Sequence, residues 1–171
     1  MDRRDPDPTG DEWTLLSQVL DYHRATLLRK VDGLDQRQLA MTTAASDLTL
    51  AGLLKHLTLN EDHWFRVVLL GASAVPPFDT VDWDGDPNWE FRTATDDDPA
   101  DLVAAYGRAC ARSRDAVASV PSLDAVSRGT STVSGKRFNA RWIVLHMIQE
   151  TARHNGHADL LREAIDGVTG E

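Results

Sequence analysis

The sequence predicts an all-α protein, a four-helix bundle with a long loop between its second and third helices. Four segments place apolar residues at intervals of three and four, which is the spacing of an amphipathic helix. Capping or helix-breaking residues bound these segments, and the sequence contains no credible sheet. Helices of this kind bury their apolar faces most simply against one another, in a bundle.

The first predicted helix follows a polar stretch. Residues 1–10 are polar and include two prolines, so we expect a flexible N-terminal tail before a single domain formed by residues 11–171. Apolar residues then recur at helical spacing over residues 12–32, and Gly33 ends the helix. The connector that follows, residues 34–47, has room for one helical turn.

The second helix is predicted over residues 49–70. Ser46 or Asp47 is the expected N-cap, because their side-chain oxygens can accept a hydrogen bond from a free backbone N–H group, and Gly71 supplies the end. The loop that follows spans residues 71–97 and contains three prolines and several acids. Compact domains seldom contain so long an irregular connection unless it covers or shapes something.

Two tryptophans lie in this loop, Trp83 and Trp89. They either close one end of the core or line a pocket, and the sequence leaves both interpretations open. The third helix opens at Asp98 and Pro99, which form an N-cap and first-turn pair, and it is expected to run to about Val120.

The last part of the chain carries the longest helix. Residues 128–140 are expected to form a loop or a short hairpin. The fourth helix is predicted over residues 139–165 and closes at Gly167.

Composition excludes several classes of function. The formal net charge is −9 and basic residues form no cluster, so nucleic acid is not an expected partner. No apolar run is long enough to span a membrane, and the N-terminus has no apolar core of a signal peptide, so we expect a cytoplasmic protein without membrane contact. The single cysteine, Cys110, lies among small residues at helical spacing and is interpreted as core packing.

A stripe of titratable residues runs along the fourth helix. Residues four apart in a helix share a face, so one quarter of the surface holds His146, Glu150, His154 and His157. Much of the rest of this helix is apolar, which predicts that the stripe is buried as well. A buried unpaired carboxylate is costly, and a divalent metal relieves that cost because Glu oxygen and His nitrogen are natural ligands of Zn²⁺ and similar ions.

A third ligand is expected from another helix, because catalytic zinc sites commonly take three ligands from the protein. The second helix offers His56, which lies among leucines, and His63, which shares its face seven residues later. Gly156, in the middle of the fourth helix, predicts a close approach of another group to the backbone. The spacing alone fits equally a metal-free network of buried Glu–His hydrogen bonds.

Three segments make a family resemblance specific: "GLLKHLTLNEDHWF", "DWDGDPNWEF" and "ARWIVLHMIQETARHNGHADLLREAIDG". Together they resemble the actinobacterial branch of the DinB-like (damage-inducible) superfamily of metal-binding four-helix bundles, over nearly all of residues 12–167. The chain is also similar to mycothiol-dependent maleylpyruvate isomerase. The resemblance implies a divalent metal bound by His56, Glu150 and His154.

The same resemblance places His157 beside the ligands, with ligation by His157 as the alternative. His63 and Trp64 are expected to wall the pocket. The metal expected is zinc, with nickel, manganese and iron as alternatives.

The resemblance implies chemistry with a small thiol. The chain ends without the further C-terminal domain of the isomerase, so we expect transfer of a mycothiol-type thiol onto an electrophile rather than isomerisation. The alternatives are a metal-dependent hydrolase and a non-enzymatic, metal-binding or stress-associated bundle. Relatives suggest a homodimer, although no apolar stripe in the sequence demands one.

Overall fold

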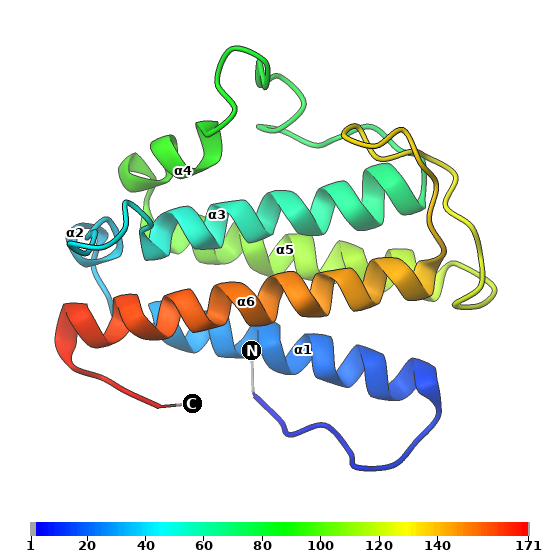
Figure 1. The fold of residues 1–171 in the computed structure, drawn as a ribbon, viewed down its shortest axis with the longest axis horizontal. Coiled ribbons are helices and arrows are strands. Elements are labelled where there is room, and N and C mark those ends of the chain that lie inside the picture. Colours follow the sequence, from blue (N-terminus) through cyan, green and yellow to red (C-terminus); the bar gives the residue numbers. More distant parts are fainter. Residues whose placement is uncertain (1–2, 171) are drawn as a thin grey trace.

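The computed structural model describes residues 3–170 and shows an all-helical bundle (Figure 1). No described residue belongs to a β-strand, and the bridges between Thr43 and Ser46 and between Val126 and Asn139 are isolated. The predicted fold class is therefore confirmed. The long elements are α1 (Glu12–Val31), α3 (Leu50–Glu61), α5 (Pro99–Ala118) and α6 (Ala140–Asp166), and the short ones are α2 (Gln36–Leu39), α4 (Trp89–Thr93) and a 3₁₀ turn, η2 (Ala94–Asp96).

The second predicted helix has the expected extent, but its second part is π-helical rather than α-helical. α3 continues into a π-helical segment, η1 (Asp62–Leu69), and the two together span nearly the whole of the predicted range. π-helical turns are rare and frequently lie at functional sites. η1 contains His63 and Trp64, two of the residues expected to wall a pocket.

The four long elements pack in two pairs that close on each other. α1 packs against α6 and α3 packs against α5, while contact between α3 and α6 joins the pairs. Figure 1 shows α3 and α6 side by side along most of their length. The core between the helices has two halves, one with Leu27, Leu53, Leu57, Tyr106 and Leu161 and one with Phe65, Val68, Ile143 and Met147.

Most predicted helix ends match the structure. Asp98 accepts a hydrogen bond from the backbone N–H of Ala100 at 2.8 Å, with Pro99 in the first turn. Gly167 ends α6 with a φ of 76°, which is the left-handed conformation that glycine adopts without strain. The predicted cap of the second helix is wrong: Thr49, not Ser46 or Asp47, accepts the backbone hydrogen bond, from Gly52 at 2.9 Å.

The reason for this error is local. The Ser46 hydroxyl accepts a hydrogen bond from the backbone of Leu48, so residues 46–48 form a turn ahead of the helix. The long loop differs from expectation as well, because residues 89–93 form α4, which packs on α3. Of the segment 128–140, residues 128–139 form a loop, because none of them is in a strand, and Ala140 begins α6.

The loop tryptophans form a partly exposed cluster next to α3. Trp89 contacts Trp83 and Phe78, with ring centroids 6.2 Å apart in both pairs. The Lys55 ammonium lies 4.3 Å from the centre of the Trp89 ring, which is a cation–π distance. Both tryptophans lie near the buried Lys55 and belong to neither half of the core, so a plug of the core, the first interpretation that the sequence left open, is wrong. The lining of a pocket stays a prediction.

The remaining expectations concern the tail and the cysteine. Residues 3–10 run back along α1, and Asp7 and Gln18 exchange two hydrogen bonds of 2.8 Å. The first two residues of the expected tail and residue 171 of the expected domain lie outside the described residues, and the flexibility of the tail stays a prediction. Cys110 is buried, and burial raises the pKa of its thiol to about 12, as suits core packing rather than a nucleophile. Among the described helices, none has a stretch long and apolar enough to cross a bilayer.

Candidate metal centre

Three of the predicted residues meet where α3 packs against α6. His56 comes from α3, and Glu150 and His154 come from successive turns of α6. Each offers one ligand atom, and the three atoms lie within 4.8 Å of one another. His154 Nε2 is 3.4 Å from Glu150 Oε2, and the rings of His56 and His154 meet edge to face with centroids 5.0 Å apart.

The positions follow from helix geometry and burial. Glu150 and His154 share a face because they are four residues apart, and the apolar residues of α6 fix that face against α3. The side chains are 21%, 21% and 11% exposed for His56, Glu150 and His154, so the site is mostly buried but keeps a partial opening to solvent.

Burial sets the protonation state of His154. Desolvation, followed by the neighbouring His56 ring, lowers the pKa of this imidazole to about 4, while Glu150 acts in the opposite direction. The ring is consequently neutral near pH 7, and a neutral imidazole is the form that binds a metal.

A fourth side chain, Glu90, was missed by sequence reasoning. It belongs to α4, is 4% exposed, and its Oε1 atom lies 3.0 Å from His56 Nδ1. A carboxylate only accepts hydrogen bonds, so Nδ1–H donates to Glu90 and Nε2 keeps its lone pair, which accepts from Asn60 Nδ2 at 2.9 Å. Metal-binding histidines commonly have such a carboxylate partner, because it fixes the tautomer and makes the other nitrogen more basic.

The long loop was the available signal for Glu90. Its length and its aromatic and acidic content predicted that it covers something, but nothing in its spacing singled out one acid among many. Only the packing of α4 on α3 selects Glu90, with Phe91 stacking on the His56 ring at a centroid distance of 4.7 Å.

The other predicted residues divide into two groups. His157 lies next to the site: its Nδ1 atom is 3.3 Å from Nδ1 of His154, on the opposite side of the ring from Glu150. His63 and Trp64 lie farther along the α6 seam, where Trp64 contacts His146 rather than the three central residues. No fourth ligand from His63 or His157 joins the described group of three.

The expectation at Gly156 is wrong. A Cβ atom at this position would meet no atom within 4 Å, and the residue is exposed. No close approach therefore requires glycine here, and the position keeps only the cost that glycine brings to a helix interior.

A family model described as mycothiol S-transferase matches residues 15–167. The chain belongs to the mycothiol S-transferase family. This family is part of the DinB-like superfamily, so the resemblance that the sequence suggested is confirmed. The match includes His56, Glu150 and His154 as well as Glu90. No curated protein sequence matches the chain.

The donor set of this mycothiol S-transferase family member suits a divalent cation. Two neutral imidazole nitrogens and one anionic carboxylate oxygen are ligands that zinc and similar ions bind. Zinc bonds of about 2.0–2.2 Å would hold such atoms roughly 3.4 Å apart, so a side-chain adjustment of about 1 Å brings the three within coordination distance. Arg153, the nearest cation that contacts Glu150, stands 4.0 Å away and is 68% exposed, so it can move aside.

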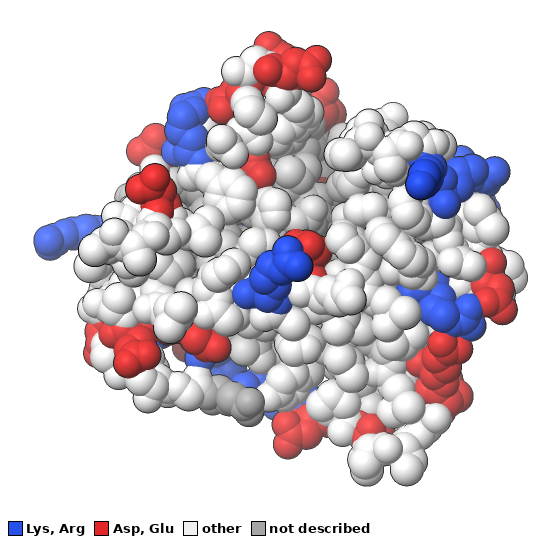
Figure 2. Space-filling view, in the orientation of Figure 1, with Lys and Arg blue, Asp and Glu red and all other residues white. Residues whose placement is uncertain are grey.

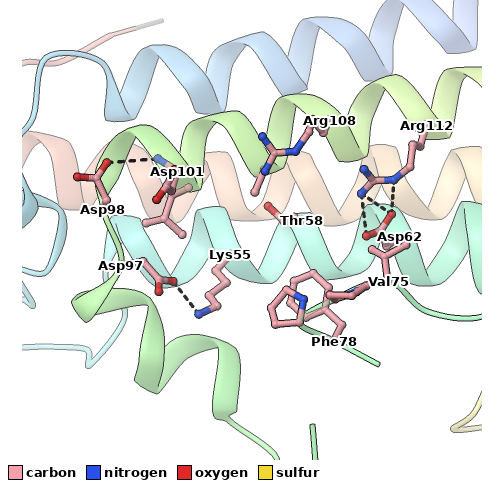
Figure 3. Close-up of a pocket in the computed structure, with 14 residues that line it drawn as sticks. Lys55, Thr58, Asp62, Val75, Phe78, Asp97, Asp98, Asp101, Arg108 and Arg112 are labelled. Carbon is pink, nitrogen blue, oxygen red and sulfur yellow. Dashed lines mark hydrogen bonds and ion pairs between the residues drawn. The ribbon is translucent and has the colours of Figure 1, made fainter. Parts of the chain in front are cut away.

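The family member also has a cavity of about 350 Å³ that none of these three residues lines. It lies between α3, α5 and residues 75–78, with Lys55, Asp62 and Arg112 among its walls (Figure 3). Two ion pairs lie within the wall: Lys55 Nζ is 2.6 Å from Asp97, and Arg112 contacts Asp62 at 2.8 Å. Arg108 and Asp101 also line the cavity, so it keeps further charged groups of both signs.

Proposed function

We propose that this protein is a divalent-metal-dependent transferase that places a low-molecular-weight thiol of the mycothiol type onto an electrophile. One observation carries the proposal: in a chain of the mycothiol S-transferase family, His56, Glu150 and His154 offer ligand atoms within 4.8 Å of one another in a partly exposed site.

His56, Glu150 and His154 would hold the cation. When bound, a divalent ion supplies positive charge that lowers the pKa of a nearby thiol, and the thiolate is the nucleophilic form. Three protein ligands leave room for an exogenous group, as in catalytic rather than structural zinc sites.

The residues around the ligands position them. Glu90 holds Nδ1–H of His56, so this ring keeps one orientation and one tautomer. His157 contacts the nitrogen of His154 that faces away from Glu150, and it limits that ring in the same way. Glu150 is 21% exposed, and the thiol and the electrophile would approach through this opening on the outer side of the site.

The overall transfer is a substitution at carbon. The sulfur electron pair forms a C–S bond, the leaving group departs with the electrons of its own bond to carbon, and the thiol proton passes to water. Phe91 covers one face of His56, and exclusion of bulk water there would strengthen the attraction between a bound cation and the thiolate.

The test combines metal analysis with a transfer assay. Protein without an affinity tag is analysed for zinc, nickel, manganese and iron, and is then assayed with mycothiol and monochlorobimane. We expect His56→Ala and Glu150→Ala to lose bound metal and activity together, and added metal to restore activity to chelator-treated wild type only.

Two matched variants serve as controls. His23→Ala removes a half-buried imidazole that contacts Tyr22, and Glu163→Ala removes an exposed acid farther along α6. Both should keep metal and activity. Full activity in metal-free wild type would contradict the proposal, and bound metal without transfer to any of a broad set of electrophiles would favour a non-enzymatic bundle.

A further inference from the structure

A column of stacked rings runs along the start of α6. Phe138 stacks on Trp142 at a centroid distance of 4.2 Å, and Trp142 stacks on His146 at 4.9 Å with an interplanar angle of 11°. Trp64 from η1 packs its ring against all three, at 4.5–5.5 Å. These four residues, Phe138, Trp142, His146 and Trp64, are called the aromatic platform below.

The platform leads directly to the proposed metal centre. Its rings on α6 follow one another at steps of four residues, and the next step after His146 is Glu150. Four residues of an α-helix rise about 6 Å, so a molecule lying on the platform reaches the ligands without crossing another element.

The rings of the aromatic platform themselves carry no charge. Burial lowers the pKa of His146 and of the adjacent His63, so both rings are neutral near pH 7. Figure 2 shows one neighbouring cation and acid at the centre of the face over α3 and α6, with uncharged surface around them and further charges toward the right edge, where α6 begins. Trp142 remains 41% exposed, which is a large open area for an aromatic side chain.

We infer that the aromatic platform binds the electrophilic co-substrate of the transferase, and that this co-substrate is a flat, uncharged aromatic compound. Aromatic rings attract one another through stacking and edge-to-face contacts, and a neutral platform imposes no desolvation cost on a neutral ring. The inference rests on the proposed function and adds the class of electrophile to it. With an aryl chloride, the thiol sulfur forms the new C–S bond, chloride leaves with the C–Cl electron pair, and the thiol proton passes to water.

The area of the platform fits a small molecule rather than a second copy of the chain. An aromatic side chain buries about 150–250 Å² when covered, so the exposed part of Trp142 and the half-buried rings around it amount to roughly 200 Å². A stable dimer needs about 800 Å² from each partner. A single monocyclic or bicyclic compound is large enough to cover the exposed area of the platform.

The first test compares two chlorides that share a leaving group, 1-chloro-2,4-dinitrobenzene and chloroacetamide, with mycothiol as the thiol. Trp142→Ala should lower the ratio of kcat/KM for the aromatic over the aliphatic substrate about tenfold. Trp142→Phe should restore most of the ratio, because a ring remains. Val103→Ala, which changes an exposed apolar residue on α5, should leave the ratio unchanged. An unchanged ratio in Trp142→Ala would overturn the inference.

The second test separates this inference from the proposed function. Binding of unreactive 1,3-dinitrobenzene is measured by quenching of tryptophan fluorescence and by calorimetry, with sedimentation of the same samples. Binding that Trp142→Ala weakens about tenfold supports the platform even if no transfer activity exists. Transfer activity with unaltered dinitrobenzene binding in Trp142→Ala leaves the function intact and refutes the platform. A dimer that Trp142→Ala dissociates, without a change in selectivity, would identify the platform as a subunit interface and would also refute it.

Discussion

Glu90 Oε1 lies 3.0 Å from Nδ1 of His56, so an acid from the loop between the second and third long helices holds an imidazole of α3. Glu90 is 4% exposed, and its other oxygen, Oε2, is buried without a hydrogen-bond partner in the described structure. An unsatisfied buried oxygen is costly. The carboxylate that carries this cost is also the group that fixes the tautomer of His56, a proposed ligand.

Replacement of Glu90 should weaken metal binding. Glu90→Gln keeps an acceptor for Nδ1–H but removes the charge, whereas Glu90→Leu removes both. We expect metal Kd to rise by about 10–100-fold, with the larger effect in Glu90→Leu, because the tautomer of His56 is no longer fixed. Competition with a chromophoric chelator measures the Kd. Glu163→Gln on α6 is the control, and equal affinities in folded Glu90→Gln, Glu90→Leu and wild type would contradict this role.

The stability of the metal-free protein should fall in acid because of His154. The pKa of its imidazole is about 4 in the folded protein and near 6.5 in an unfolded chain. The unfolded state therefore takes up a proton first as the pH falls, so this contribution is complete above pH 6.5 and is lost between pH 6.5 and 4. The loss is on the order of 3 kcal/mol of unfolding free energy.

Urea unfolding of chelator-treated protein across this pH range measures the loss. His154→Asn cannot titrate, so its unfolding free energy should decline less steeply with acid than that of wild type. Parallel curves for the two proteins would show that His154 does not titrate between the folded and unfolded states.

Gly156→Ala should stabilise the protein. The residue is exposed inside α6, and an added Cβ would meet no atom within 4 Å. Alanine loses less backbone entropy on folding, which raises the free energy of unfolding by about 0.5–1 kcal/mol. Thermal and urea unfolding give the value, with metal content as a check that the site is intact. A destabilised variant would reveal a constraint on the backbone at this position.

The buried pair of Arg24 and Glu61 should be costly to break and much less costly to replace. The guanidinium of Arg24 forms two hydrogen bonds to the Glu61 carboxylate, at 2.8 and 2.5 Å, and the residues are 2% and 0% exposed. Arg24→Met alone leaves a buried, unpaired carboxylate and should cost about 3–5 kcal/mol of unfolding free energy. The double variant Arg24→Met/Glu61→Leu should recover most of that loss, because no charge is left buried.

A double-mutant cycle from urea unfolding tests this relationship. The control is the exposed pair of Arg92 and Asp86, whose disruption by Asp86→Asn should change stability by less than about 1 kcal/mol. Additive effects of the two core substitutions would mean that the pair contributes no coupling.

Helix lengths and helix ends were predictable because they depend on neighbouring residues. Asp98, Pro99 and Gly167 act through backbone groups a few residues away, so the pattern alone placed these boundaries. The N-cap of α3 was wrong because Ser46, Asp47 and Thr49 all carry side-chain oxygens. The choice among them depends on how the preceding turn folds, which the pattern does not contain.

The sequence by itself determined the bundle and the shared face of Glu150 and His154, because both follow from periodicity within single helices. Tertiary structure alone brought His56 to that face, selected Glu90 from an acid-rich loop and joined Trp64 to the rings of α6. These contacts join residues far apart in the chain, and they are decided by which apolar faces pack together. That packing also shows that nothing approaches Gly156, where a glycine inside a helix had suggested a neighbour.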